Sequence, residues 1–203
     1  MNLKILSLVI IGVCILLPDV CYAFLEKDVH LLNMQNGLAD NTVSAVYKDK
    51  EGFVWFGTRN GLSRYDGRQI TNFEQSNSYP SISNLKEVFD GVLAFVDNGV
   101  FSAFDLKKER FLSVVSSSEK RIPSWGMLQK NDSLVWVISG SELHLMKRCA
   151  SKEGELRLRV QEKYTGWDNQ DNLLVAITYS SDKKSICLID EKGRIILLDA
   201  TNL

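Results

Sequence analysis

Three turn signals in the stretch Gly37 to Phe73 constrain the fold more than any other feature of the sequence. The pairs Asn60-Gly61 and Asp66-Gly67 are strong short-range hairpin signals, because asparagine, aspartate and glycine all accept the positive φ angles of tight hairpin turns. A third turn is predicted over Asp49 to Gly52, where glycine supplies a backbone angle that other residues resist. Hairpins at these three places would join four strands into one antiparallel meander.

Segments rich in apolar, aromatic and β-branched residues flank those turns, as strands require. The four predicted strands are 41–47, 53–58, 62–65 and 69–73. The second, Phe53 to Thr58, is apolar and aromatic, which is typical of a strand buried on both faces. A single sheet of this size cannot bury both of its faces, so the pattern predicts further copies of the unit.

The same stretch resembles the repeat of the two-component regulator propeller family, which forms the periplasmic sensor region of Bacteroides-type hybrid two-component systems. The residues that carry the resemblance are Gly37, Leu38, Asn41, Val43, Asp49, Gly52, Trp55, Gly57, Thr58, Gly61, Leu62, Tyr65, Asp66 and Gly67. The rest of the chain matches the family pattern only in the spacing of its predicted strands and turns. The resemblance implies an all-β fold, a β-propeller of four-stranded antiparallel blades.

Weaker copies of the unit at 37–73 follow at about 81–115, 123–161 and 165–203. The spacing that separates Trp55 from Leu93 also separates Asn60 from Asn98, and each asparagine precedes a glycine. In the third unit, Trp136 takes the place of Trp55. A period of roughly 40 residues with four strands in each unit is the signature of propeller blades.

The fourth unit is the least regular, and its fourth strand is missing or cut short. We therefore expect about four blades in a partial or open ring, as the amino-terminal fragment of a longer sensor. A strand at Val29 to Leu32, which includes His30, would complete the blade formed by the other terminus in a closed propeller. An open ring leaves sheet edges without partners, so the chain on its own is expected to be poorly soluble.

The amino terminus has the composition of a signal peptide, predicted over residues 1–23. Lys4 precedes the apolar run Ile5 to Leu17, and the segment Cys21 to Ala23 has small residues at a cleavage site, so cleavage is expected after Ala23. The run is shorter than the roughly 20 residues of a membrane span; an uncleaved anchor is the alternative. The mature chain, 24–203, is expected in the periplasm.

Two cysteines, Cys149 and Cys187, remain in the mature chain. An oxidising compartment permits a disulfide between them. Nothing in their spacing brings them together, so two separate thiols are the favoured interpretation.

Composition and motifs favour a binding module over an enzyme. Lysine and arginine number 24, and aspartate and glutamate 25, a near-neutral balance that disfavours nucleic-acid binding. The sequence has no metal-ligand spacing, nucleophile motif or phosphate-binding glycine loop. His30 and His144 lie far apart in strand patterns, and Asp49 to Gly52 is interpreted as a hairpin rather than a calcium site. We therefore expect no catalytic residue, no metal and no cofactor.

Four residues are the candidate ligand contacts: Trp125, Trp167, Asp168 and Asp40. They belong to predicted loops that lead into the inner strands, at the end of the channel where propellers tend to meet ligands. A flat indole face suits a sugar ring, although packing between blades is the alternative for both tryptophans. Aromatic residues of the predicted second strands are interpreted as core residues instead.

The resemblance implies detection of polysaccharide-derived oligosaccharides outside the cytoplasmic membrane. Self-associating ectodomains would then bias a histidine kinase across the membrane and so control transcription. This chain would hold part of the sensing surface, while the kinase, the output modules and the membrane segment would lie downstream. The alternatives are a secreted propeller hydrolase or lyase acting on glycans, and a truncated gene product without a signalling role.

Overall fold

The structure, a computed structural model, describes residues 30–74, 81–116, 121–166 and 172–201. The chain divides into two compact units, Met1–Leu32 and Asn33–Leu203, and the second contains all the regular structure described here. That structure consists of fifteen strands and one short 3-10 helix, η1 (Met34–Asn36). The described residues are thus all-β, as predicted.

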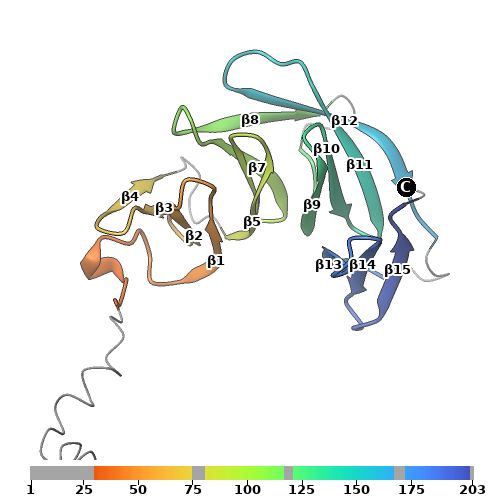
Figure 1. Cartoon of the computed structure of the whole chain (residues 1–203), viewed down its shortest axis with the longest axis horizontal. Helices are drawn as coiled ribbons and strands as arrows, with labels where there is room; N and C mark the ends of the chain where they lie inside the picture. The colour runs from red at the N-terminus through yellow and green to blue at the C-terminus, as the bar shows by residue number, and fades with distance from the viewer. Residues whose placement is uncertain (1–29, 75–80, 117–120, 167–171, 202–203) are drawn as a thin grey trace, which may run out of the picture. The chain divides into compact units, whose positions relative to one another are not determined.

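Consecutive strands pair antiparallel into four meanders, in chain order within each meander (Figure 1). The first meander contains β1 (Val43–Lys48), β2 (Val54–Thr58), β3 (Gly61–Tyr65) and β4 (Ile70–Phe73). The second contains β5 (Ile82–Phe89), β6 (Val92–Asp97), β7 (Val100–Asp105) and β8 (Arg110–Ser116). The third contains β9 (Gly126–Asn131), β10 (Leu134–Ser139), β11 (Glu142–Cys149) and β12 (Glu155–Tyr164). The fourth contains three described strands, β13 (Leu174–Tyr179), β14 (Ser185–Asp190) and β15 (Ile195–Asp199).

The sheets follow one another as propeller blades do. The first strand of each blade contacts the first strand of the next, since β1 contacts β5, β5 contacts β9, and β9 contacts β13. A hydrophobic cluster fills each of the three joints between successive blades. The predicted β-propeller architecture of four-stranded antiparallel blades is therefore confirmed.

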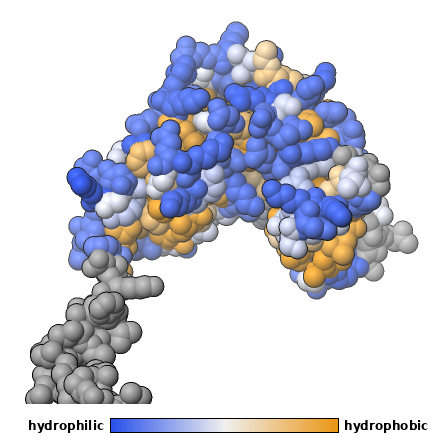
Figure 2. Space-filling model, in the orientation of Figure 1, coloured by the Kyte–Doolittle hydropathy of each residue, from blue (hydrophilic) through white to orange (hydrophobic). Residues whose placement is uncertain are grey.

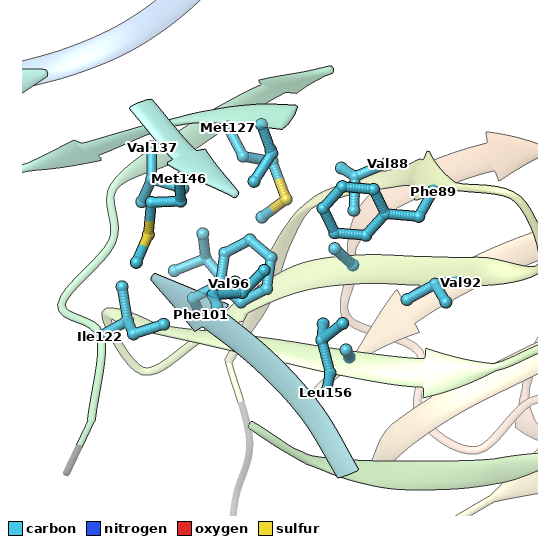
Figure 3. Packing of buried hydrophobic residues seen from close by; sticks show 14 residues of the cluster. Val88, Phe89, Val92, Val96, Phe101, Ile122, Met127, Val137, Met146 and Leu156 are labelled. Atoms are coloured by element: carbon cyan, nitrogen blue, oxygen red, sulfur yellow. The ribbon is translucent and has the colours of Figure 1, made fainter. Parts of the chain in front are cut away.

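The joint between the second and third blades holds the largest cluster. Figure 3 shows Met127 and Met146 of the third blade pointing into this cluster, which Phe89, Val96 and Phe101 of the second blade line from the other side. All five side chains are at most 3% exposed. The flexible thioether chains fill the space that rigid aromatic and β-branched groups leave.

An additional backbone link joins the same two blades. The β12 segment Glu155–Leu158 pairs in parallel with Ser113–Ser116 of β8, so the two blades form one eight-stranded sheet. Beside this pairing, Lys108 Nζ and Arg110 Nη2 lie 2.7 and 3.1 Å from Glu153 Oε1. The sequence pattern gives no sign of this pairing, because it joins outer strands far apart in the chain.

The prediction of a strand at Val29 to Leu32 is wrong for residues 30–32, which the structure describes. His30, Leu31 and Leu32 lie outside any strand, and Val29 is outside the described residues. A strand persists by pairing with a neighbour, and no described segment pairs with these residues. The predicted signal peptide also lies outside the described residues. No helix in the described part of the chain is long and apolar enough to cross a membrane.

The outward face of the fourth blade is apolar (Figure 2). Ile195 and Leu197 of β15 are 67% and 66% exposed, and they pair with Ile189 and Cys187 of β14. Cys187 and Cys149 are both free thiols, as favoured from the sequence. Alternate residues of β14 and β15 pack on the third blade instead. This blade therefore has apolar residues on both faces, one of them uncovered by the described residues.

The joint between the first two blades depends on a residue without a side chain. A Cβ on Gly57 would lie 2.6 Å from Ile82 Cγ2 and 3.2 Å from the Ile82 carbonyl oxygen. Gly57→Ala should therefore lower the free energy of unfolding, by about 1–3 kcal/mol, as overpacking typically does. Urea denaturation of the variant and the wild type measures this difference.

Gly126→Ala is the matched control for Gly57→Ala. A Cβ on Gly126 would lie 3.4 Å from methyl groups of Ile138 and Ile177 and 3.9 Å from Asn84 Oδ1. Those side chains can move by a few tenths of an ångström, so the loss of stability should be smaller. Equal losses for the two variants would contradict the explanation.

Candidate functional site

A carboxylate fixes the tryptophan of the first blade. The indole Nε1 of Trp55 donates a hydrogen bond of 2.7 Å to Asp49 Oδ2. The other oxygen, Asp49 Oδ1, accepts hydrogen bonds from the backbone N–H groups of Glu51 and Phe53, at 3.0 and 2.9 Å. One side chain thus shapes the β1–β2 turn and holds a ring that is 1% exposed. The fixed spacing between Asp49 and Trp55 has this structural cause, and the hairpin interpretation is confirmed.

Other residues of the repeat pattern also support turns. Thr58 Oγ1 accepts a hydrogen bond from Asn60 N at 3.1 Å and donates one to Gly61 O at 3.0 Å. Asp66 accepts from the backbone N–H groups of Gln69 and Arg68, and these bonds hold the pKa of Asp66 below its ordinary value. The residues that carry the repeat pattern therefore stabilise the turns of the first blade.

A depression of about 460 Å³ lies between the first and second blades. Charged groups along it pair with one another: Lys50 Nζ lies 3.2 Å from Glu87 and 3.9 Å from Asp90, and Lys107 Nζ lies 3.4 Å from Asp90. The full lining is Asp49, Lys50, Glu51, Phe53, Trp55, Arg64, Glu87, Asp90, Gly91, Leu106, Lys107 and Glu109. Its volume is in the range of small-molecule sites.

Arg64 covers the aromatic wall of this depression. Its guanidinium lies 4.8 Å from the ring centre of Phe53 and 5.6 Å from those of Trp55 and Phe73. The same group pairs with Glu109 of the second blade at 2.5 Å. The aromatic rings and the guanidinium are thus in contact with one another. The ion pair with Glu109 links the two blades. The first depression therefore has the character of a structural joint.

A second depression, of about 380 Å³, lies between the third and fourth blades. Trp136 lines it, and this residue occupies in the third blade the place that Trp55 has in the first. Among the lining residues Gln129, Lys130, Trp136, Tyr179, Lys183, Ile186 and Ala200, the charged groups are both lysines. Unlike the lining of the first depression, the described lining of this one contains no carboxylate.

Two of the four sequence-predicted contacts can be placed. The half-exposed Trp125 precedes β9; its backbone N–H donates to Ile138 O at 3.1 Å, and its carbonyl accepts from Asn84 Nδ2 at 3.0 Å. Asp40 precedes β1 and accepts from the Thr42 N–H at 2.6 Å. No hydrogen bond or ring contact links Asp40 to Trp125 in the described structure. The other two predicted contacts, Trp167 and Asp168, lie outside the described residues.

Neither depression contains a predicted contact residue. Asp40 and Trp125 precede the first strands of their blades, whereas both depressions involve turns that follow those strands. The depressions therefore lie at the opposite end of the sheets.

A buried histidine of β11 belongs to a small polar network. His144, 4% exposed, lies with Nε2 2.6 Å from Glu142 Oε2, and Lys163 Nζ lies 3.5 Å from the same oxygen. The hydrogen bond from His144 is the main cause that holds the pKa of Glu142 below its ordinary value. Within the described ranges, no three histidine, cysteine or carboxylate side chains cluster as metal ligands.

Comparison with known proteins identifies the repeat of the first blade. Residues 37–60 match the model of a family described as Two component regulator propeller. This match confirms the resemblance for that repeat. No curated protein sequence matches the chain significantly.

Solved propeller structures share the fold at low sequence identity. The extracellular domain described as part of a hybrid two component system, BT4673 from B. thetaiotaomicron, aligns with a TM-score of 0.57 and 18% identity over 78% of this chain and 21% of that one. The corresponding domain of BT3049 from the same bacterium gives 0.56 and 19%, over 85% and 25%. The C-terminal WD40 domain of Sif2 gives 0.57 and 11%, over 80% and 47%. The chain thus spans less than half the length of each.

Removal of the Asp49 carboxylate tests its role at Trp55. Asp49→Ala leaves the buried indole N–H without an acceptor, which should lower the free energy of unfolding by about 1–3 kcal/mol in addition to the loss of turn hydrogen bonds. Asp66→Ala, which removes turn hydrogen bonds alone, is the control and should cost less. In a Trp55→Phe background, Asp49→Ala should cost less than in the wild type. Equal costs in the two backgrounds would show that the indole bond contributes nothing.

The lowered pKa of Glu142 predicts a specific dependence of stability on pH. Its ionised form is favoured in the folded state, so this contribution is present above the unfolded-state pKa of about 4.3 and is lost as pH falls through the lower folded-state value. Glu142→Gln should therefore lose less stability than the wild type between pH 6 and 3. Urea titrations at several pH values measure this, with Glu191→Gln on an exposed turn as control. Parallel pH curves for Glu142→Gln and the wild type would refute the assignment.

Proposed function

We propose that this chain, whose residues 37–60 form a two-component regulator propeller repeat, is part of the extracytoplasmic ligand-sensing propeller of a hybrid two-component system. The match of that repeat is the observation that carries the proposal. The propeller fold shared with extracellular domains described as parts of such systems supports it. In this proposal the chain is exported, its signal peptide is removed after Ala23, and it works in the periplasm.

The proposed role is regulatory rather than catalytic. The sensed ligand is an oligosaccharide derived from a polysaccharide, and its binding shifts a dimer of ectodomains and biases a histidine kinase that lies outside this chain. A ligand can shift such an equilibrium only by as much as it prefers one of the two states. The output is control of transcription.

Trp125 is the best-placed described residue for contact with a sugar ring. Its side chain is 50% exposed, while hydrogen bonds at both its backbone N–H and its carbonyl oxygen fix its position. An exposed indole on a hydrogen-bonded backbone presents a large apolar face to a ligand. Asp40, Trp167 and Asp168 remain the other proposed contacts.

The uncovered apolar face of the fourth blade fits a role as part of a larger propeller. Ile195 and Leu197 project from it, as apolar residues do at the joints between the described blades. In the proposed sensor a further blade covers this face. Exposed apolar surface of this kind otherwise favours association.

Binding without turnover is the result expected from this function. The full chain is titrated calorimetrically with oligosaccharides from digests of plant and host polysaccharides, and the products are assayed for new reducing ends. Binding should occur with no release of reducing ends. Trp125→Ala should weaken it about tenfold, the scale of a lost aromatic contact, while Leu197→Ala should leave it unchanged. Absence of binding to every digest, or cleavage of a bound oligosaccharide, would overturn the proposal.

A further inference from the structure

The first strands of the first two blades each contain a bulge whose side chain reaches the next blade. The register is interrupted at Ser44 of β1 and at Asn84 of β5. Ser44 Oγ donates a hydrogen bond to the carbonyl oxygen of Ile82, at the start of β5. Asn84 Nδ2 donates one of 3.0 Å to the carbonyl oxygen of Trp125, directly before β9. Bulges commonly re-aim side chains in this way.

The two links end on residues of opposite exposure. Ile82 is fully buried, so the link from Ser44 supports the interior of the joint between the first two blades. Trp125 is 50% exposed, so the link from Asn84 ends on a residue that a ligand can touch. Asn84 is therefore the bulge residue that lies next to the proposed sugar contact.

The hydrogen bond to Trp125 determines how the amide of Asn84 is oriented. A carbonyl oxygen accepts only from the NH₂ group of an amide, so Nδ2 faces Trp125 and Oδ1 faces away from its carbonyl. Within the described residues, Oδ1 accepts no hydrogen bond and is not one of the buried polar atoms that lack a partner. Asn84 thus presents an accessible acceptor of fixed orientation next to Trp125.

We propose that Asn84 and Trp125 bind one sugar ring together, an inference that rests on the function proposed above. The apolar face of the ring packs on the indole, and a hydroxyl of the same ring donates a hydrogen bond to Asn84 Oδ1. A site built to pair with a hydroxyl discriminates strongly against analogues that lack it. Asn84 therefore determines which sugars the site accepts, while Trp125 supplies the stacking surface. Neither depression contains Asn84 or Trp125.

The backbone at Asn84 allows the amide to be removed without strain. Asn84 has a φ of 51°, which glycine also adopts readily. The full chain is titrated calorimetrically with the polysaccharide digests named above, and Asn84→Gly should weaken oligosaccharide binding about tenfold, the scale of one lost hydrogen bond. Lys183→Gly is the matched control, at a φ of 58° on an exposed turn of the fourth blade, and should bind as the wild type does. Equal affinities of Asn84→Gly and the wild type would overturn the proposal.

NMR of the wild-type chain separates a ligand contact from a purely structural role of Asn84. After assignment of the side-chain signals, the Cγ signal of Asn84 should move downfield on addition of the digests, because its oxygen then accepts a hydrogen bond. The indole signal of Trp125 should move over the same range of ligand concentrations. This measurement decides the question even if Asn84→Gly does not fold.

The two signals also distinguish the failure of this proposal from the failure of the proposed function. A shift of the Trp125 signal with an unmoved Asn84 signal would refute the role of Asn84 and leave the sensing function intact. Absence of any response of the wild type to every digest would overturn both.

Discussion

The structure depends on the need of each four-stranded sheet to cover two apolar faces. A sheet this small has no interior of its own, so its stability comes from the clusters that it shares with the next blade. The contact of Gly57 with Ile82 shows how closely the first two blades approach. Where a neighbour is lacking among the described residues, as at Ile195 and Leu197, apolar side chains remain exposed.

The polar contacts of the buried tryptophans differ from one joint to the next. In the first joint, the carboxylate of Asp49 holds Trp55 and Glu109 holds Arg64, so the residues of the repeat pattern support the architecture. In the joint between the third and fourth blades, the buried Trp136 lies edge-on to Tyr164 and beneath the ammonium group of Lys130.

The sequence predicted the candidate site only in part. Trp125 is exposed at the start of a first strand, as its loop position indicated, but no described contact joins it to Asp40. Both depressions lie at the opposite end, and residues of two different blades line each of them. Such a surface arises from residues far apart in the chain, and spacing within one repeat contains no information about it. The irregular register of β9 with β10, which leaves Lys130 outside the regular pairing, was also not visible in the sequence.

The sequence by itself determined the blades, because hairpins and strand alternation are local properties. The turn at Asp49 to Gly52 and the pair Asn98-Gly99 lie between strands in the structure, and Asn60-Gly61 forms the turn from β2 to β3, with Gly61 as the first residue of β3. Only the tertiary structure decided the parallel pairing of β8 with β12 and the place of the two depressions. It also overturned the strand that included His30. In each of these cases the physical reason is that the outcome depends on a partner segment distant in sequence, and no local pattern encodes that partner.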